Sequence, residues 1–204
     1  MPFDTLLALA TFAFVTSISP GPSNFMLLAS GANFGFLRTV PQILGITVGF
    51  TTVLCSVGLG LGAVLTAVPA LHLAVKIAGA AYLLYLAWCI AMSRSLGGGD
   101  AEKDSAAKTK HPLTFLQSAA FQWINPKAWI AAMTAIAVYA QPGTPVTSLL
   151  ILGAVIAVVN LPSVSVWAGF GLALRGLLAN PQRLKWFNIT MGALLAATLG
   201  PMLR

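Results

Sequence analysis

Two long apolar segments of this chain are each interrupted near the middle by a polar stretch that contains proline. The first interruption is Ser19-Pro20-Gly21-Pro22-Ser23-Asn24, and the second is Gln122-Trp123-Ile124-Asn125-Pro126-Lys127. About 15 residues lead from Thr5 to Pro20 and from Leu113 to Lys127, which at about 1.5 Å per helical residue is roughly 22 Å of helix. In a hydrocarbon layer about 30 Å thick, both interruptions would lie near the midplane. Irregular backbone at that depth is tolerated where protein buries it or where it lines a watery cavity, so the pattern predicts a solute site.

The composition favours a membrane protein. Hydrophobic residues make up 58% of the 204 residues, charged residues make up only 7%, and the mean hydropathy is +0.89. A soluble domain needs more charged surface. The formal net charge of +7 does not indicate nucleic-acid binding, because the basic residues lie in short connections between apolar segments rather than along a basic stripe. The first apolar run has no Lys or Arg before it and is too long for a secretory signal, so we expect a retained span.

The apolar segments predict an all-α membrane protein with six transmembrane helices. A polar linker at 93–111 would separate two sets of three, one within 1–92 and one within 112–204. An odd number of spans in each set gives the sets opposite orientations, so we expect two inverted three-helix repeats with broken helices 1 and 4. The expected spans are 3–32, 41–68, 71–92, 113–140, 146–174 and 186–203.

The connections also predict an orientation. If the N-terminus lies outside the cytoplasm, the linker and the connections around Arg38 and Arg175 are cytoplasmic and collect most of the basic residues. The opposite orientation inverts this bias. The positive-inside rule therefore predicts that both termini are periplasmic and that the linker is cytoplasmic.

A solute site for a zwitterion at this depth would need positive charge for a carboxylate and acceptors for an ammonium group. Lys127 and the helix N-terminal amides at the breaks could meet the carboxylate. Backbone carbonyls released by the prolines, together with amide side chains, could accept hydrogen bonds from the ammonium. The candidate site or helix-break residues are therefore Pro20, Gly21, Pro22, Asn24, Gln122, Asn125, Pro126, Lys127 and Asn160.

Each candidate also has a purely structural interpretation. Pro20, Gly21 and Pro22 could form a simple kink, and Gln122 and Asn160 could serve as hydrogen-bonding contacts between helices. Snorkelling of Lys127 to an interface is disfavoured, because about 20 Å of apolar helix lies on either side. Pro162, two residues after Asn160, predicts a further helix irregularity within 146–174.

Several motifs together resemble the LysE/RhtB family of amino-acid exporters. They are Ser19-Pro20-Gly21-Pro22, the Gly45 and Gly49 pair, Gly79-Ala80-Ala81-Tyr82-Leu83 and Asn125-Pro126-Lys127-Ala128. The resemblance implies export of amino acids or close derivatives across a bacterial inner membrane, driven by the proton motive force, by a homo-oligomer such as a dimer. Asn160 to Ser163 and Trp186 to Asn188 are most similar to exporters of neutral amino acids and cysteine. The loop after the first span departs from the family, because it offers only Arg38 as a charge.

Proton coupling is left open by the sequence. No Asp or Glu lies within an expected span, so either Lys127 exchanges a proton for substrate or the protein is an uncoupled facilitator. A structural membrane subunit and an exporter of another solute are further alternatives. No nucleophile with a base, metal-ligand cluster or CxxC motif indicates an enzyme, a metal, a cofactor or a redox carrier. Cys55 and Cys89 are expected to be buried apolar residues.

Overall fold

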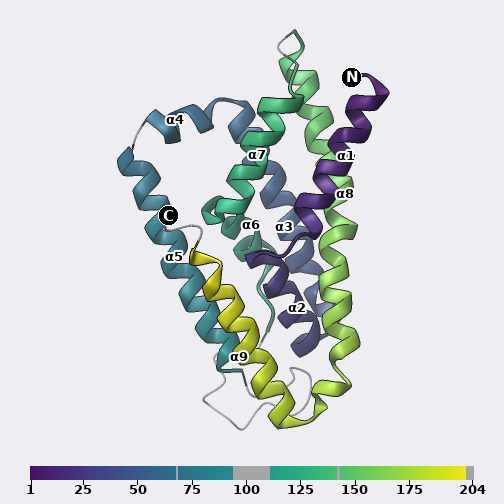
Figure 1. Cartoon of the computed structure of the whole chain (residues 1–204), viewed down its shortest axis with the longest axis vertical. Coiled ribbons are helices and arrows are strands. Elements are labelled where there is room, and N and C mark those ends of the chain that lie inside the picture. The colour runs from purple at the N-terminus through teal and green to yellow at the C-terminus, as the bar shows by residue number, and fades with distance from the viewer. Residues whose placement is uncertain (68, 94–110, 142, 201–204) are drawn as a thin grey trace.

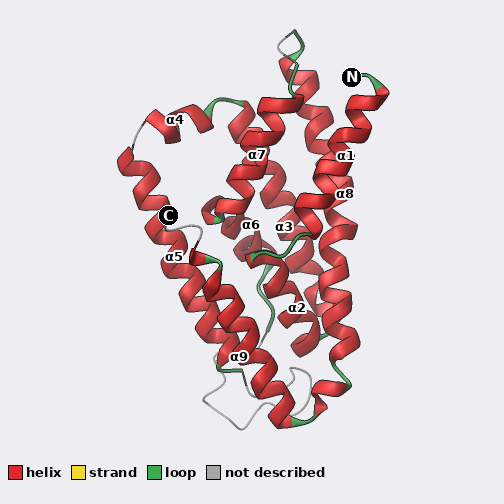
Figure 2. Cartoon of the chain, viewed as in Figure 1, coloured by secondary structure: helices red, strands yellow, loops and turns green. Residues whose placement is uncertain are grey.

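The computed structural model describes residues 1–67, 69–93, 111–141 and 143–200. These residues form helices and short connections with no strand among them (Figure 1, Figure 2), which confirms the all-α class. The helices are α1 (Phe3–Ile18), α2 (Pro22–Phe34), α3 (Phe36–Gly58), α4 (Leu61–Ala67), α5 (Pro69–Ala91), α6 (Phe115–Ile124), α7 (Pro126–Tyr139), α8 (Pro145–Leu174), the short 3-10 helix η1 (Leu177–Ala179) and α9 (Pro181–Ala197).

Both expected interruptions are observed, and the same local rule produces both. A proline disfavours helical backbone in the residue before it, and Ser19 and Asn125 are accordingly extended, with ψ of 143° and 109°. Proline suits the first position of a helix, where its missing N–H has no partner to lose. Pro22 and Pro126 occupy that position in α2 and α7. The first break bends α1 relative to α2 by 59°.

The helices run between two ends of an elongated molecule (Figure 1). The N-terminus, α4 and the turn between α7 and α8 lie at one end, which we call the N-terminal end. The end of α5, the start of α9 and the connection from α8 lie at the other, which we call the linker end. The predicted linker falls almost wholly at 94–110, outside the described residues. In the centre, α2 packs on α8 and α3 packs on α6, while α5 pairs with α9.

Two of the described helices, α3 and α8, are long and apolar enough to cross a membrane by themselves. The bent pair of α1 and α2 passes the same test as a unit, which gives up to three candidate spans. The helices α6, α7 and α9 are shorter, with 10, 14 and 17 residues. The six-span inverted repeat therefore remains a prediction.

The two glycines spaced by four in α3 allow close helix packing, as expected of this motif. A Cβ atom placed on Gly45 would collide with the backbone carbonyl of Phe115, and one on Gly49 would collide with backbone atoms of Ala119. The backbones of α3 and α6 are thus in direct contact. This contact brings the helix that ends at the second break against the centre of the molecule.

The irregularity expected within 146–174 is absent, and this prediction was wrong. Helix α8 runs from Pro145 to Leu174 as one element with Pro162 inside it. Proline is tolerated inside membrane helices when neighbouring groups hold the segment in place. Here Asn160 is tied to α1 and α3 by its side chain, and Trp167 donates a hydrogen bond to the Ile18 carbonyl at 3.1 Å.

Candidate functional site

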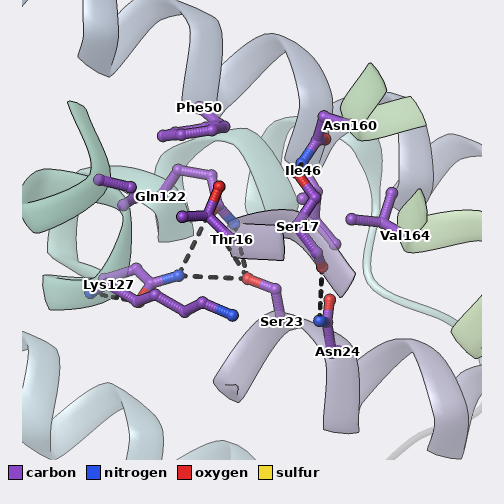
Figure 3. A pocket seen from close by; sticks show the side chains of 13 residues that line it. Thr16, Ser17, Ser23, Asn24, Ile46, Phe50, Gln122, Lys127, Asn160 and Val164 are labelled. Atoms are coloured by element: carbon purple, nitrogen blue, oxygen red, sulfur yellow. Dashed lines mark hydrogen bonds between the residues drawn. The ribbon is translucent and has the colours of Figure 1, made fainter. Parts of the chain in front are cut away.

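The two helix breaks meet at one small central cavity. Its lining comes from six helices and includes all five polar candidates that the sequence identified (Figure 3). The polar lining residues are Thr16, Ser17, Ser23, Asn24, Gln122, Asn125, Lys127 and Asn160, and the apolar ones are Ile46, Phe50, Ala128, Ala131 and Val164. Residues more than a hundred positions apart in the chain therefore share one polar space.

The carbonyl groups released at the first break are all paired with protein donors. The Asn24 amide donates to the carbonyls of Ser17 and Ser19, both at 2.8 Å. The carbonyl of Ile18, which lies between these two residues, accepts a hydrogen bond from Trp167 Nε1. Unpaired carbonyls at the end of a buried helix are costly, so these donors explain how the break is stabilised.

Lys127 lies between the two breaks and joins them. Its position is the second residue of α7, yet its Nζ donates to the carbonyl of Ser19 at 2.6 Å and to that of Pro20 at 3.4 Å. The side chain crosses Gly21 so closely that a Cβ atom there would lie 2.9 Å from the lysine Cδ. The Gly21 backbone is extended, with φ of −179°, so contact with Lys127 rather than backbone conformation favours glycine.

The second break is held by a cluster of amides around one hydroxyl. Ser23 Oγ accepts from Gln122 Nε2 at 3.1 Å and from Asn125 Nδ2 at 3.2 Å. Gln122 Oε1 also accepts a hydrogen bond from Asn125 Nδ2. Asn125 Oδ1 in turn accepts from the backbone N–H of Lys127 and caps α7. One of the helix amides expected for a substrate carboxylate is thus used by Asn125.

Asn160 connects α8 to the same cavity from the opposite side. Its Nδ2 donates to Ser17 Oγ at 2.9 Å, and its Oδ1 accepts from Thr47 Oγ1 at 2.9 Å. These bonds match the structural interpretation of Asn160 as a contact between helices. Because the side chain also lines the cavity, the structural and substrate-binding roles are compatible.

The remaining candidates line a larger cavity on the other side of Lys127. Pro20, Gly21, Pro22 and Pro126 line this adjoining cavity, whose volume is about 370 Å³. The central cavity measures about 40 Å³. At about 10–15 Å³ for each water-sized group, the central cavity holds about three or four such groups. An amino acid enters it only if the helices separate or the side chains rearrange.

Sequence reasoning missed the hydroxyl groups that complete the site. Ser17, Ser23 and Thr47 are buried, and each bonds to one of the amides of the cavity. The signal available in the sequence was proximity to the breaks, since Ser17 and Ser23 flank Pro20 and Pro22. Thr47 carries no such signal, because only the packing of α3 on α8 brings it to Asn160.

Comparisons with known proteins identify the family of this chain. The family model described as LysE type translocator matches residues 14–200. The chain is 33% identical over 145 residues to the cysteine/O-acetylserine efflux protein of Escherichia coli O1:K1, covering 70% of this chain and 69% of that protein. It is 32% identical over 148 residues to the protein of the same name from Escherichia coli O157:H7, covering 72% and 71%.

No solved structure matches the chain. The family match, together with the apolar helices, indicates a multi-pass membrane protein. The family model covers both helix breaks and every residue of the central cavity. The chain therefore belongs to the LysE type translocator family.

Proposed function

We propose that this protein exports a small neutral amino acid or a close derivative such as O-acetylserine, by alternating access around the central cavity. One observation carries the proposal: both helix breaks meet where an ammonium group, several amides and backbone carbonyls lie together. The names of the relatives, which are efflux proteins for cysteine and O-acetylserine, support the same substrate class.

The hydrogen bonds of Lys127 suggest how the substrate is held. An amino acid carries an ammonium group of its own, which can replace Lys127 Nζ at the carbonyls of Ser19 and Pro20. The released lysine ammonium then pairs with the substrate carboxylate, in a charge-assisted contact. Binding thus exchanges one ammonium for another at the first break, so the carbonyls keep a donor throughout.

Charge in the cavity would select against basic substrates. Within the described ranges, Lys127 is the one charged residue that lines the central cavity, and no Asp or Glu lines it. A second positive charge on the side chain of lysine or arginine would be repelled in this low-dielectric setting. We therefore infer a preference for substrates without net charge.

Transport by purified protein in lipid vesicles tests the proposal. Vesicles are loaded with labelled O-acetylserine, a neutral amino acid or lysine, and loss of label is compared with that from protein-free vesicles. We expect faster loss of the neutral solutes and no acceleration for lysine. Gln122→Met should reduce the rate because it removes the amide bound to Ser23, whereas Gln182→Met, an exposed change on α9, should not. Equal loss of every solute with and without protein would contradict amino-acid export.

The proposed location is the bacterial inner membrane, with both termini periplasmic. The support comes from the described basic residues Arg38, Arg175, Arg183 and Lys185. Arg38 lies at the start of α3, Arg175 just after α8, and Arg183 and Lys185 in the first turns of α9. These parts of the helices lie toward the linker end. Basic residues favour the cytoplasmic side, so the linker end would be cytoplasmic.

We propose proton exchange at Lys127 as the coupling step. Asp4 is the one acidic residue within the described ranges, and it lies in the first turn of α1, away from the central cavity. Collapse of the proton gradient at constant voltage should therefore slow export by the native protein. An unchanged rate would contradict coupling and favour the uncoupled facilitator.

A further inference from the structure

A second cavity lies next to the central one, toward the linker end. It is lined by residues of α2, α3 and α5 and by the segment before α6, and its volume is about 70 Å³. Its polar lining residues are Ser30, Asn33, Gln42, Cys89, Ser93 and His111. None of the sites described above includes these residues.

The two cavities follow one another along the same helices. On α3, Ile46 lines the central cavity and Gln42 lines the second one, four residues or about 6 Å apart along the helix. On α2, Asn24 lines the central cavity and Met26 lines the second. A solute moving from the linker end to the breaks along α2 and α3 would therefore meet the second cavity first.

Most polar side chains in the second cavity are already paired. Ser30 Oγ lies 2.8 Å from Thr39 Oγ1, in a hydrogen bond between the two hydroxyls. Asn33 Nδ2 donates to Asn188 Oδ1 at 2.9 Å, and Asn188 Nδ2 donates back to Asn33 Oδ1 at 3.2 Å. These bonds fix the shape of the cavity and tie α2 to α9.

Gln42 is the exception. Its side chain is only 1% exposed, yet its Oε1 accepts no hydrogen bond from any described residue. A buried polar atom without a partner costs about 1–3 kcal/mol, and a molecule in the cavity that donates a hydrogen bond to Gln42 would remove this cost. Since the oxygen and nitrogen of an amide exchange places by a flip, Gln42 can offer either an acceptor or donors to a molecule in the cavity.

We propose that this second cavity is a loading site, where a small amino acid binds before it reaches the central cavity; the inference rests on the export function proposed above. Gln42 hydrogen-bonds the ammonium or the carboxylate of the solute. Among the described residues, the lining contains no Lys, Arg, Asp or Glu, so the site suits a zwitterion without net charge. At about 10–15 Å³ per water-sized group it holds about five to seven such groups, close to the size of cysteine.

Cys89 provides a direct measure of occupancy, because it lines the second cavity and is 3% exposed. The only other cysteine, Cys55, does not line it. In a Cys55→Ala variant reconstituted in vesicles, the rate of Cys89 alkylation by a small maleimide is measured with and without serine, which is about the size of cysteine and has no thiol. At ten times the half-saturating concentration we expect alkylation to slow about 10-fold. Alkylation of Cys55 in a Cys89→Ala variant should not change.

Two further measurements separate the loading site from the export function. Gln42→Met should abolish the protection of Cys89 by serine, whereas Gln182→Met should preserve it. Efflux is measured on the same vesicles. Efflux with no protection of Cys89, or with a Cys89 that is never alkylated, would overturn the loading site alone. Absence of efflux would overturn the proposed function, whatever the protection.

Discussion

Replacing Lys127 by methionine is expected to reduce export by about 10- to 100-fold. Methionine keeps most of the apolar stem that packs over Gly21 but removes the ammonium that bonds the Ser19 carbonyl. A hydrogen bond to a charged group contributes about 1.5–3 kcal/mol, and about 1.4 kcal/mol corresponds to a factor of ten. The measurement is the initial rate of O-acetylserine efflux from vesicles with matched amounts of protein.

The matched control for this change is Lys185→Met, an exposed lysine in the first turns of α9. It should leave the export rate within about twofold, since a surface charge contributes little to local energetics. Lys127→Arg should retain part of the activity, because it keeps the charge but has a larger, planar head group. Normal efflux by Lys127→Met would indicate that Lys127 has only a structural role, and it would contradict the proposed exchange of ammonium groups.

The helix breaks could be predicted from the sequence because their cause is local. A proline restricts the residue before it and begins the next helix well, so Pro20, Pro22 and Pro126 determine where α1 and α6 end. The same signal was available at Asn180-Pro181, where Asn180 accepts from two backbone amides and α9 begins. The expected span at 186–203 begins later because Arg183 and Lys185 indicate a basic connection, whereas α9 includes both. The last residues of that span, 201–203, lie outside the described ranges.

Helix ends inside apolar runs could not be predicted in this way. The segment expected at 41–68 has no charged residue, and no proline after Pro41, to mark an end, yet α3 stops at Gly58 and α4 follows. Gly60, with φ of 102°, adopts left-handed backbone that other residues rarely adopt, and it makes the turn between the two helices. Gly62, two residues later, lies within α4. The presence of a glycine therefore does not predict which position forms the turn.

The hydrogen-bond partners of the site residues also could not be predicted from the sequence. The residue types pointed to Lys127 and the amides as one polar group, and the structure brings them to one cavity. From the sequence, the backbone carbonyls at the first break were expected to be available to a substrate. In the structure, Asn24, Trp167 and Lys127 donate hydrogen bonds to them. Such pairings depend on how α1, α7 and α8 pack, which no local pattern specifies.

The contact between α2 and α8 predicts the largest loss of stability. A Cβ atom on Gly171 would collide with the Leu28 carbonyl, and one on Gly31 would collide with the Ala168 carbonyl. The atoms in the way belong to helix backbones, which cannot rotate aside as a side chain can. Gly171→Leu should therefore cost about 3 kcal/mol, the upper part of the usual range for overpacking. For a chain of this size that corresponds to a fall in melting temperature of roughly 6–12 °C.

Gly169→Leu is the matched control, because it makes the same change two residues earlier in α8, where a Cβ atom would meet nothing within 4 Å. Leucine favours helix over glycine by about 1 kcal/mol, so this variant should melt at the same temperature or slightly higher. Both variants are compared with the native protein in the same detergent. Equal melting temperatures for the two variants would mean that α2 and α8 can separate without loss of stability. Since α2 carries Ser23 and Asn24 and α8 carries Asn160, a close contact between these helices is what holds the two sides of the central cavity together.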